Sequence, residues 1–132
     1  MFKIIPMLNP DGVIIGNTRT TLVGTDMNRQ FGEDPDLDPK LNPVPIAVKQ
    51  LIQGLIKGDR EKIVAFIDLH QHSKKKSIFI YGPYYPLHQD KYLQVRIIPK
   101  LLSERSEMFR FFSSRFRLDK YKENCARIQI GK

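Results

Sequence analysis

The sequence predicts an α/β layer fold with a largely buried sheet. Short runs rich in β-branched residues alternate along the chain with longer segments whose apolar residues recur at helical spacing. The 132 residues are 41% hydrophobic and 27% charged, a composition typical of one globular domain. No apolar run approaches the roughly 20 residues that a membrane span needs, and we therefore expect no membrane partner.

Four short segments are predicted as strands. Residues 3–8 are the first, and the turn signal Asn-Pro-Asp-Gly follows them at residues 9–12. Residues 62–69 contain the apolar run IVAFI between charged flanks, and residues 77–81 read SIFIY. Runs this short and apolar are typical of fully buried strands. Residues 125–130 are predicted as the last strand.

Two longer segments are predicted as helices. Residues 46–56 place apolar side chains at helical spacing, and Gly58 would end that helix. Residues 92–108 have a weaker helical pattern, in which Pro99 is expected to start, break or kink the helix. The proline-rich and acidic residues 32–45 are predicted to form an exposed connection.

The densest polar cluster follows the IVAFI run, where residues 68–73 read Asp-Leu-His-Gln-His-Ser. His70 and His72 share one face if the strand continues that far. Neutral imidazole is a good Zn²⁺ ligand, and a nearby carboxylate would orient it. A polar strand end without a metal is the alternative. A catalytic zinc site needs about three protein ligands, and the remaining histidine, His88, lies in a proline-rich loop. This chain does not readily assemble such a site by itself.

A second polar cluster lies on a glycine-rich loop. Its candidate functional residues are Arg19, Asn28 and Arg29. The planar fork of arginine suits recognition of a carboxylate, to which the asparagine amide also donates. The alternative is a solvated loop whose arginines bind no ligand.

The third feature is positive charge. Lysine and arginine outnumber the acidic residues by 22 to 14, which gives a net charge of +8 and favours an acidic partner. Residues 96–127 are basic and interleaved with phenylalanines, a pattern also found in platforms for single-stranded nucleic acid. Buried phenylalanines between solvated arginines are the simpler interpretation. Cys125 is the single cysteine, so no internal disulfide forms and we expect a cytosolic protein.

Several motifs occur in an order that resembles a known family. They are PMLNPDGV at residues 6–13, GNTR at 16–19, GTDMNRQF at 24–31, DLHQHSKKKSIFIYGP at 68–83 and KYKENCARI at 120–128. In this order they resemble the cytosolic carboxypeptidases, a branch of the zinc metallocarboxypeptidase family that includes carboxypeptidase A. The resemblance implies a three-layer α/β/α fold with a mixed sheet. Residues 1–132 would form the central part of that catalytic domain, incomplete at both ends.

The resemblance also assigns roles to individual residues. His70 matches the family's third zinc ligand, and Arg19 matches the arginine that polarises the scissile carbonyl and stabilises the oxyanion. Asn28 and Arg29 match the pair that binds the terminal α-carboxylate of the substrate. Arg127 falls where the family sets its S1′ specificity, and its charge implies a preference for acidic C-terminal side chains.

Three further positions follow from the same resemblance. Asp26 matches a carboxylate that orients a zinc-bound histidine. His72 is not a zinc ligand, and Gln71 replaces a glycine that is usual in this branch. The family's first two zinc ligands lie in an H-x-x-E motif, which this sequence lacks, and the sequence ends before the position of the catalytic glutamate. We therefore expect the 132 residues alone to be inactive.

Partners and location are implied as well. The cytosolic branch removes glutamates from polyglutamylated tubulin and other acidic protein tails. We therefore expect acidic C-termini as substrates, Zn²⁺ as cofactor, a cytoplasmic location with association to microtubules or cilia, and no nucleic-acid partner. Two alternatives remain open: a non-catalytic fragment that keeps the carboxylate-binding residues, and a basic nucleic-acid-binding module.

Overall fold

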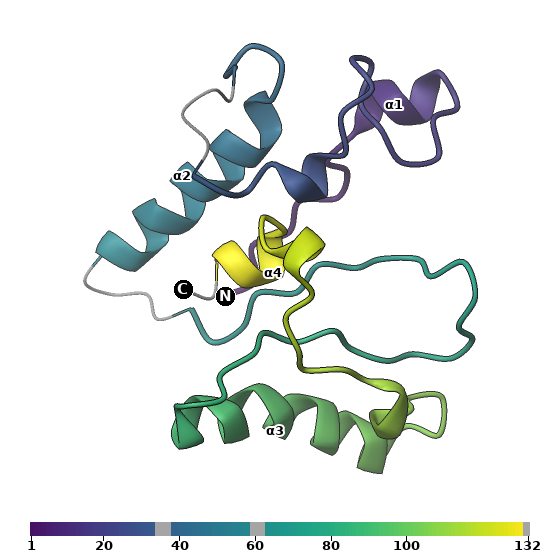
Figure 1. Cartoon of the computed structure of the whole chain (residues 1–132), viewed down its shortest axis with the longest axis vertical. Helices are drawn as coiled ribbons and strands as arrows, with labels where there is room; N and C mark the ends of the chain where they lie inside the picture. Colours follow the sequence, from purple (N-terminus) through teal and green to yellow (C-terminus); the bar gives the residue numbers. More distant parts are fainter. Residues whose placement is uncertain (34–37, 59–62, 131–132) are drawn as a thin grey trace.

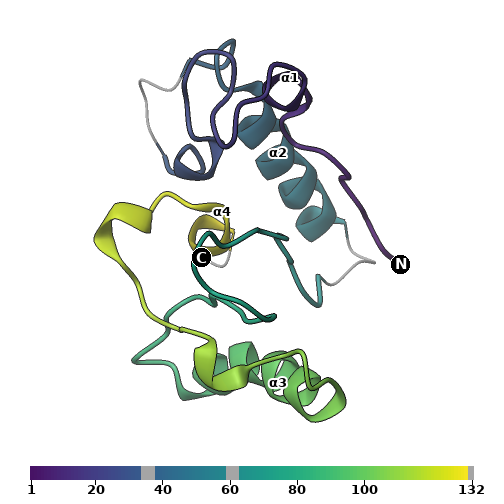
Figure 2. The same cartoon turned by 90° about the vertical axis from the view of Figure 1, so that its right-hand side faces the viewer.

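Two long helices, α2 (Pro43–Lys57) and α3 (Gln89–Arg105), lie on opposite sides of a central region (Figure 1). Extended chain and the short helix α4 (Ala126–Gln129) occupy that region, and a view at right angles gives the same order (Figure 2). This computed structural model describes residues 1–33, 38–58 and 63–130. The remaining elements are short: α1 (Pro10–Ile14) and the 3-10 turns η1 (Met27–Arg29), η2 (Phe111–Ser113) and η3 (Lys120–Lys122).

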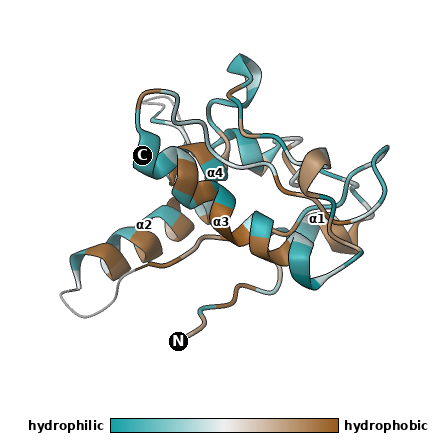
Figure 3. Ribbon diagram, turned by 90° about the horizontal axis from the view of Figure 1, so that it is seen from below, coloured by the Kyte–Doolittle hydropathy of each residue, from teal (hydrophilic) through white to brown (hydrophobic). Residues whose placement is uncertain are grey.

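Helix α2 confirms the helix predicted for residues 46–56 and extends it at its start. Pro43 occupies the first turn, where proline loses no intrahelical hydrogen bond, and Gly58 follows the last helical residue. Apolar and polar residues alternate along the helix, as expected for an amphipathic helix with one buried face (Figure 3). The described part of the predicted connection 32–45 is not uniformly exposed, because Asn42 and Pro45 are buried; residues 34–37 lie outside the described residues.

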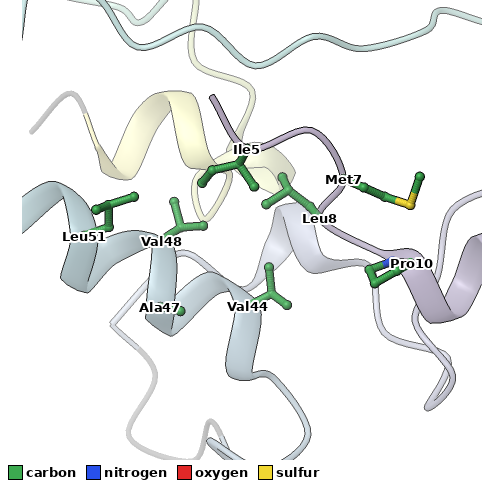
Figure 4. Close-up of a pocket in the computed structure, with 8 residues that line it drawn as sticks. All are labelled: Ile5, Met7, Leu8, Pro10, Val44, Ala47, Val48 and Leu51. Atoms are coloured by element: carbon green, nitrogen blue, oxygen red, sulfur yellow. The ribbon is translucent and has the colours of Figure 1, made fainter. Parts of the chain in front are cut away.

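The apolar core joins α2 to distant parts of the chain. Phe31, Val48 and Ala126 are buried against one another, and four partly buried side chains pack on them: Leu8, Val44, Ile52 and Ile130. The N-terminal segment crosses α2 beside this core, where Ile5 and Leu8 lie over the helix and help line a shallow apolar pocket (Figure 4). Burial of these side chains is the main term that holds α2 against α4.

Helix α3 continues through Pro99, a residue in the middle of the helix that is buried from solvent. Proline has no N–H, so the carbonyl of Val95 loses its usual helical partner at this point. The helix predicted for residues 92–108 is thus present, shifted toward the N-terminus, and Pro99 neither starts nor ends it; a kink at Pro99 stays a prediction. The guanidinium of Arg96 lies 3.5 Å from the ring centroid of Tyr92 and 4.3 Å from that of Phe116. This stacking joins α3 to the aromatic segment that follows it.

The mixed sheet is not confirmed. Within the described residues the pairing consists of two isolated parallel bridges, Ile78 with Phe109 and Tyr81 with Arg115. Four backbone hydrogen bonds of 2.8 to 3.0 Å support them. The predicted strand at 77–81 is thus present only as these two contacts. An α/β arrangement of helices around extended chain remains.

Two of the predicted strands are wrong within the described residues. Residues 3–8 and 63–69 form no ladder there, and Val64 and Leu69 are 89% and 92% exposed; Lys62 lies outside the described residues. A strand is stable only when a neighbouring strand pairs its N–H and C=O groups, and the described residues supply none here.

The C-terminal prediction is also wrong, because residues 125–130 contain helix α4 and no strand. The carbonyl of Cys125 accepts hydrogen bonds from the N–H groups of Ile128 and Gln129, each at 3.1 Å. The N–H of Ala126 donates to the side-chain Oδ1 of Asn28 at 2.9 Å. This bond satisfies one of the N–H groups that a helix leaves unpaired at its start. A distant asparagine thus helps begin a helix where the local pattern favours a strand.

The predicted turn at residues 9–12 is the start of helix α1. The Asn9 side chain accepts from the N–H of Gly12 at 3.2 Å, and Pro10 occupies the first turn. In the described ranges, no helix is both long and apolar enough to cross a membrane.

Candidate active site

Asp26 gathers the arginines of the glycine-rich loop. Its Oδ2 lies 2.8 Å from Nε and 2.7 Å from Nη2 of Arg19, and 3.9 Å from Nη1 of Arg29. Its Oδ1 accepts from the backbone N–H of Asn28 at 3.1 Å and so caps η1. One carboxylate therefore orients two guanidinium groups and fixes the turn that carries Asn28 and Arg29.

Asn28 connects this loop to two other parts of the chain. Its Oδ1 accepts from the backbone N–H of Ala126, and because that group only donates, the amide nitrogen Nδ2 must point the other way. Nδ2 lies 3.2 Å from Nε2 of His70 and 3.5 Å from Oδ2 of Asp68. The side chain of Arg29 donates to the carbonyl of Asn28 at 2.8 Å. The loop, the start of α4 and the histidine segment meet at this asparagine.

Asp68 is the carboxylate partner of His70. Its Oδ1 lies 3.0 Å from the imidazole Nδ1. This hydrogen bond is the largest cause of a raised pKa for His70, and partial burial of the ring and the charge of Arg19 oppose it. In the neutral ring Nδ1–H donates to Asp68 and Nε2 accepts from Asn28. The two contacts thus specify one tautomer.

Five of the predicted site residues form one connected group, and Arg127 lies outside it. Arg19, Asp26, Asn28 and Arg29 form the group together with His70. Among the described residues no histidine contacts Asp26 directly, so its role beside a zinc-bound histidine stays a prediction. The sequence predicts that a nearby carboxylate orients a histidine of this cluster without saying which one, and the structure shows that Asp68, two residues before His70 on an extended segment, is that partner.

The described residues do not by themselves fit a zinc site. They contain no group of three His, Cys, Asp or Glu side chains placed to hold a metal ion. His70 offers one ligand nitrogen, and both of its ring nitrogens already have hydrogen-bond partners. A catalytic zinc centre takes about three protein ligands. No chemical step through a metal follows from these side chains alone.

Arg127 lies on α4, directly after the residue that bonds to Asn28. Its Nε is buried without a hydrogen-bond partner among the described residues, and its guanidinium carbon lies 5.8 Å from the ring centroid of Tyr81. The ammonium groups of Lys75 and Lys122 each lie 5.5 Å from the same centroid. The sequence does not single out these two lysines, because each stands among other basic residues.

Comparisons with known proteins identify the family. Residues 1–107 match the sequence pattern of the zinc carboxypeptidases. The chain belongs to this family, whose members are zinc-dependent metallocarboxypeptidases, and Zn²⁺ is the metal that the family implies.

Its relatives are cytosolic carboxypeptidases. The chain is 38% identical to cytosolic carboxypeptidase 3 of Bos taurus, over 100% of this chain and 13% of the relative. It is 37% identical to cytosolic carboxypeptidase 6 of Homo sapiens, over 99% of this chain and 25% of the relative. It is 39% identical to cytosolic carboxypeptidase 1 of Danio rerio, over 98% and 12%. The chain thus spans a quarter or less of the length of these relatives.

Proposed function

We propose that this chain carries the substrate-carboxylate and oxyanion side of a metallocarboxypeptidase active site. The observation that supports this most directly is the grouping of Arg19, Asn28 and Arg29 around Asp26, with His70 in contact with Asn28. Fixed positive groups beside a candidate metal ligand suit a reaction in which a carbonyl oxygen gains negative charge. Residues 1–132 would then be part of a larger catalytic domain.

Each residue would have one role in the complete enzyme. Asn28 and Arg29 bind the terminal α-carboxylate of the substrate, which confines cleavage to the last peptide bond, because an internal peptide would leave their donors unpaired. Arg19 stabilises the oxyanion. His70 supplies one zinc ligand and Asp26 orients the arginines and a zinc-bound histidine; the remaining ligands and the general base would come from outside the described group.

The substrate we propose is an acidic protein C-terminus, such as a glutamate-rich or polyglutamylated tail of the kind found on tubulin. The net charge of +8 and the positive side chain of Arg127, whose Nε is buried without a hydrogen-bond partner among the described residues, support this choice, because both favour a polyanion. The names of the relatives support a cytoplasmic location, for which we propose association with microtubules or cilia. We propose no nucleic-acid or membrane partner.

A second candidate is a carboxylate-binding fragment without hydrolytic activity. It is favoured by the absence of a three-ligand metal group among the described residues. Both candidates bind a terminal carboxylate, and only the first requires that a complete protein hydrolyse it.

Both candidate functions require that the chain binds a terminal carboxylate, and this binding can be measured. Calorimetry with the full chain should show a peptide with a free C-terminus binding at least tenfold more tightly than its C-terminal amide, and Arg29→Gln should remove the difference. Arg110→Gln is the matched control, since Arg110 is exposed and the change in net charge is the same. Equal affinity for acid and amide would disprove the carboxylate role. Release of a C-terminal residue by the full chain with added Zn²⁺, seen by mass spectrometry, would exclude the fragment reading.

A further inference from the structure

Three cationic side chains from different segments surround the ring of Tyr81. Lys75 comes from the loop after His72, Lys122 from η3 and Arg127 from α4. Their charged groups lie 5.5, 5.5 and 5.8 Å from the ring centroid. An aromatic face attracts a cation, but it does not neutralise three of them.

The carboxylates near these three cations do not neutralise them. Lys122 lies 3.5 Å from Oδ2 of Asp119, a carboxylate that also pairs with Arg117 at 3.1 Å. Among the described residues, no carboxylate pairs with Lys75 or Arg127. Arg127 also has a buried Nε–H without an acceptor within the described ranges, and a buried donor of this kind is rarely left unpaired. A bound anion would satisfy both deficits.

Lys75 is held in place, unlike its neighbours in the lysine run. Its Nζ donates to the carbonyl of Ser113 at 2.7 Å and lies 4.6 Å from the ring centroid of Phe79. The Nδ1 of His72 accepts from the backbone N–H groups of Lys74 and Lys75 at 3.1 and 3.0 Å, which fixes the loop. An ammonium group has three donors, so two remain for a ligand. A side chain ordered in advance loses less entropy on binding.

We propose that Lys75 and Lys122 form one cationic site with Arg127 around Tyr81, and that this site binds side-chain carboxylates of an acidic peptide. Three cations against one shared internal carboxylate leave room for two ligand carboxylates, so a run of glutamates fits better than a single acidic residue. Lys75 and Lys122 are then specificity-determining residues. The inference rests on the proposed function for the identity of the peptide, but the anion site itself stands on the contacts around Tyr81.

The test compares binding of four peptides to the full chain by calorimetry. One pair ends in Glu-Glu-Glu and the other pair ends in Gln-Gln-Gln. Each pair consists of one peptide with a free C-terminal acid and one with a C-terminal amide. Lys75→Met should weaken binding of the Glu peptides about tenfold and leave the Gln peptides within twofold, and Lys75→Arg should restore most of the affinity. Lys76→Met is the matched control, because Lys76 is exposed and the same charge is lost. Equal weakening by Lys75→Met and Lys76→Met would overturn the proposal.

A second pair of variants covers the case in which Lys75→Met perturbs folding, as judged by circular dichroism and thermal melting. Lys122→Met should act like Lys75→Met, and the exposed Lys120 in the same turn gives the control Lys120→Met. A preference for acid over amide without a preference for Glu over Gln would refute this site and leave the proposed binding of the terminal carboxylate by Asn28 and Arg29 standing. The reverse result would refute the terminal-carboxylate role alone. Tighter binding of a single-stranded oligonucleotide than of the Glu peptides would also overturn the proposal.

Discussion

The amide nitrogen of Asn28 lies 3.2 Å from Nε2 of His70, although 42 residues separate them in the sequence. The lone pair on Nε2 of the neutral ring thus faces an amide donor. Because Asn28 is held by the start of α4 at the same time, the contact couples the histidine to the C-terminal part of the chain. Asn28 therefore links the histidine segment, the glycine-rich loop and α4.

The titration of His70 follows from these two partners. Asp68 raises the pKa of His70 above its ordinary value of 6.5, and replacing that carboxylate by Asp68→Asn should lower it. Asn28→Asp should raise it further, because a carboxylate would replace the amide donor that favours the neutral ring. NMR of the imidazole protons against pH measures both. An unchanged His70 titration in Asp68→Asn would contradict the assignment.

The raised pKa of His70 determines how the free energy of unfolding changes with pH. A raised pKa in the folded chain means that protonated His70 stabilises the fold at pH values below 6.5. This contribution is lost as the pH rises through the raised value. The free energy of unfolding from urea titrations should therefore fall over that interval in the native chain, and fall less in Asp68→Asn.

Asp26 should matter for stability as well as for binding. Asp26→Ala removes the acceptor for the N–H of Asn28 and the partner of Arg19, and we expect a loss of about 1 kcal/mol, typical of a lost cap. Asp11→Ala is the control variant, because Asp11 is exposed and its replacement removes the same negative charge. Urea denaturation measures both. Similar losses in the two variants would mean that Asp26 acts through net charge alone.

Gly82 lies so close to Phe116 that a side chain does not fit. A Cβ at Gly82 would lie 2.5 Å from Cδ1 of Phe116, whose ring is itself stacked on Arg96. Gly82→Ala should destabilise the chain by about 1–3 kcal/mol, the usual range for overpacking. Gly54→Ala is the contrasting case: its Cβ meets nothing within 4 Å, and α2 should gain about 0.5–1 kcal/mol. Thermal melting would show shifts of opposite sign, and a neutral Gly82→Ala would contradict the packing.

Arg96 should not be replaceable by lysine. Its planar guanidinium lies between the rings of Tyr92 and Phe116, and an ammonium group does not stack in this way. Arg96→Lys should cost about 0.5–2 kcal/mol of stability. Arg105→Lys, at the exposed end of the same helix, should change stability little. Equal melting temperatures for both variants would show that the stacking contributes nothing.

The sequence determines those elements whose information is local. Helix α2 has its own apolar period, prolines in its first turn and a glycine after its last residue, and it is present where it was predicted. Residues 125–130 fail for the opposite reason, because Asn28 supplies an acceptor for the first turn of α4 from 98 residues away. A distant partner of this kind leaves no trace in a local pattern.

The same distinction between local sequence information and long-range contacts applies to the candidate site. The family resemblance that the motifs carry implies Arg19, Asp26, Asn28, Arg29 and His70 as site residues, and the structure brings them together. Only the tertiary structure shows which distant groups meet: Asn28 with His70, and the ring of Tyr81 with Lys75 and Arg127. Residue types and their order specify which chemistry is available. Hydrogen bonds and charge pairing act over a few ångströms, so only the folded chain determines which groups come close enough to use it.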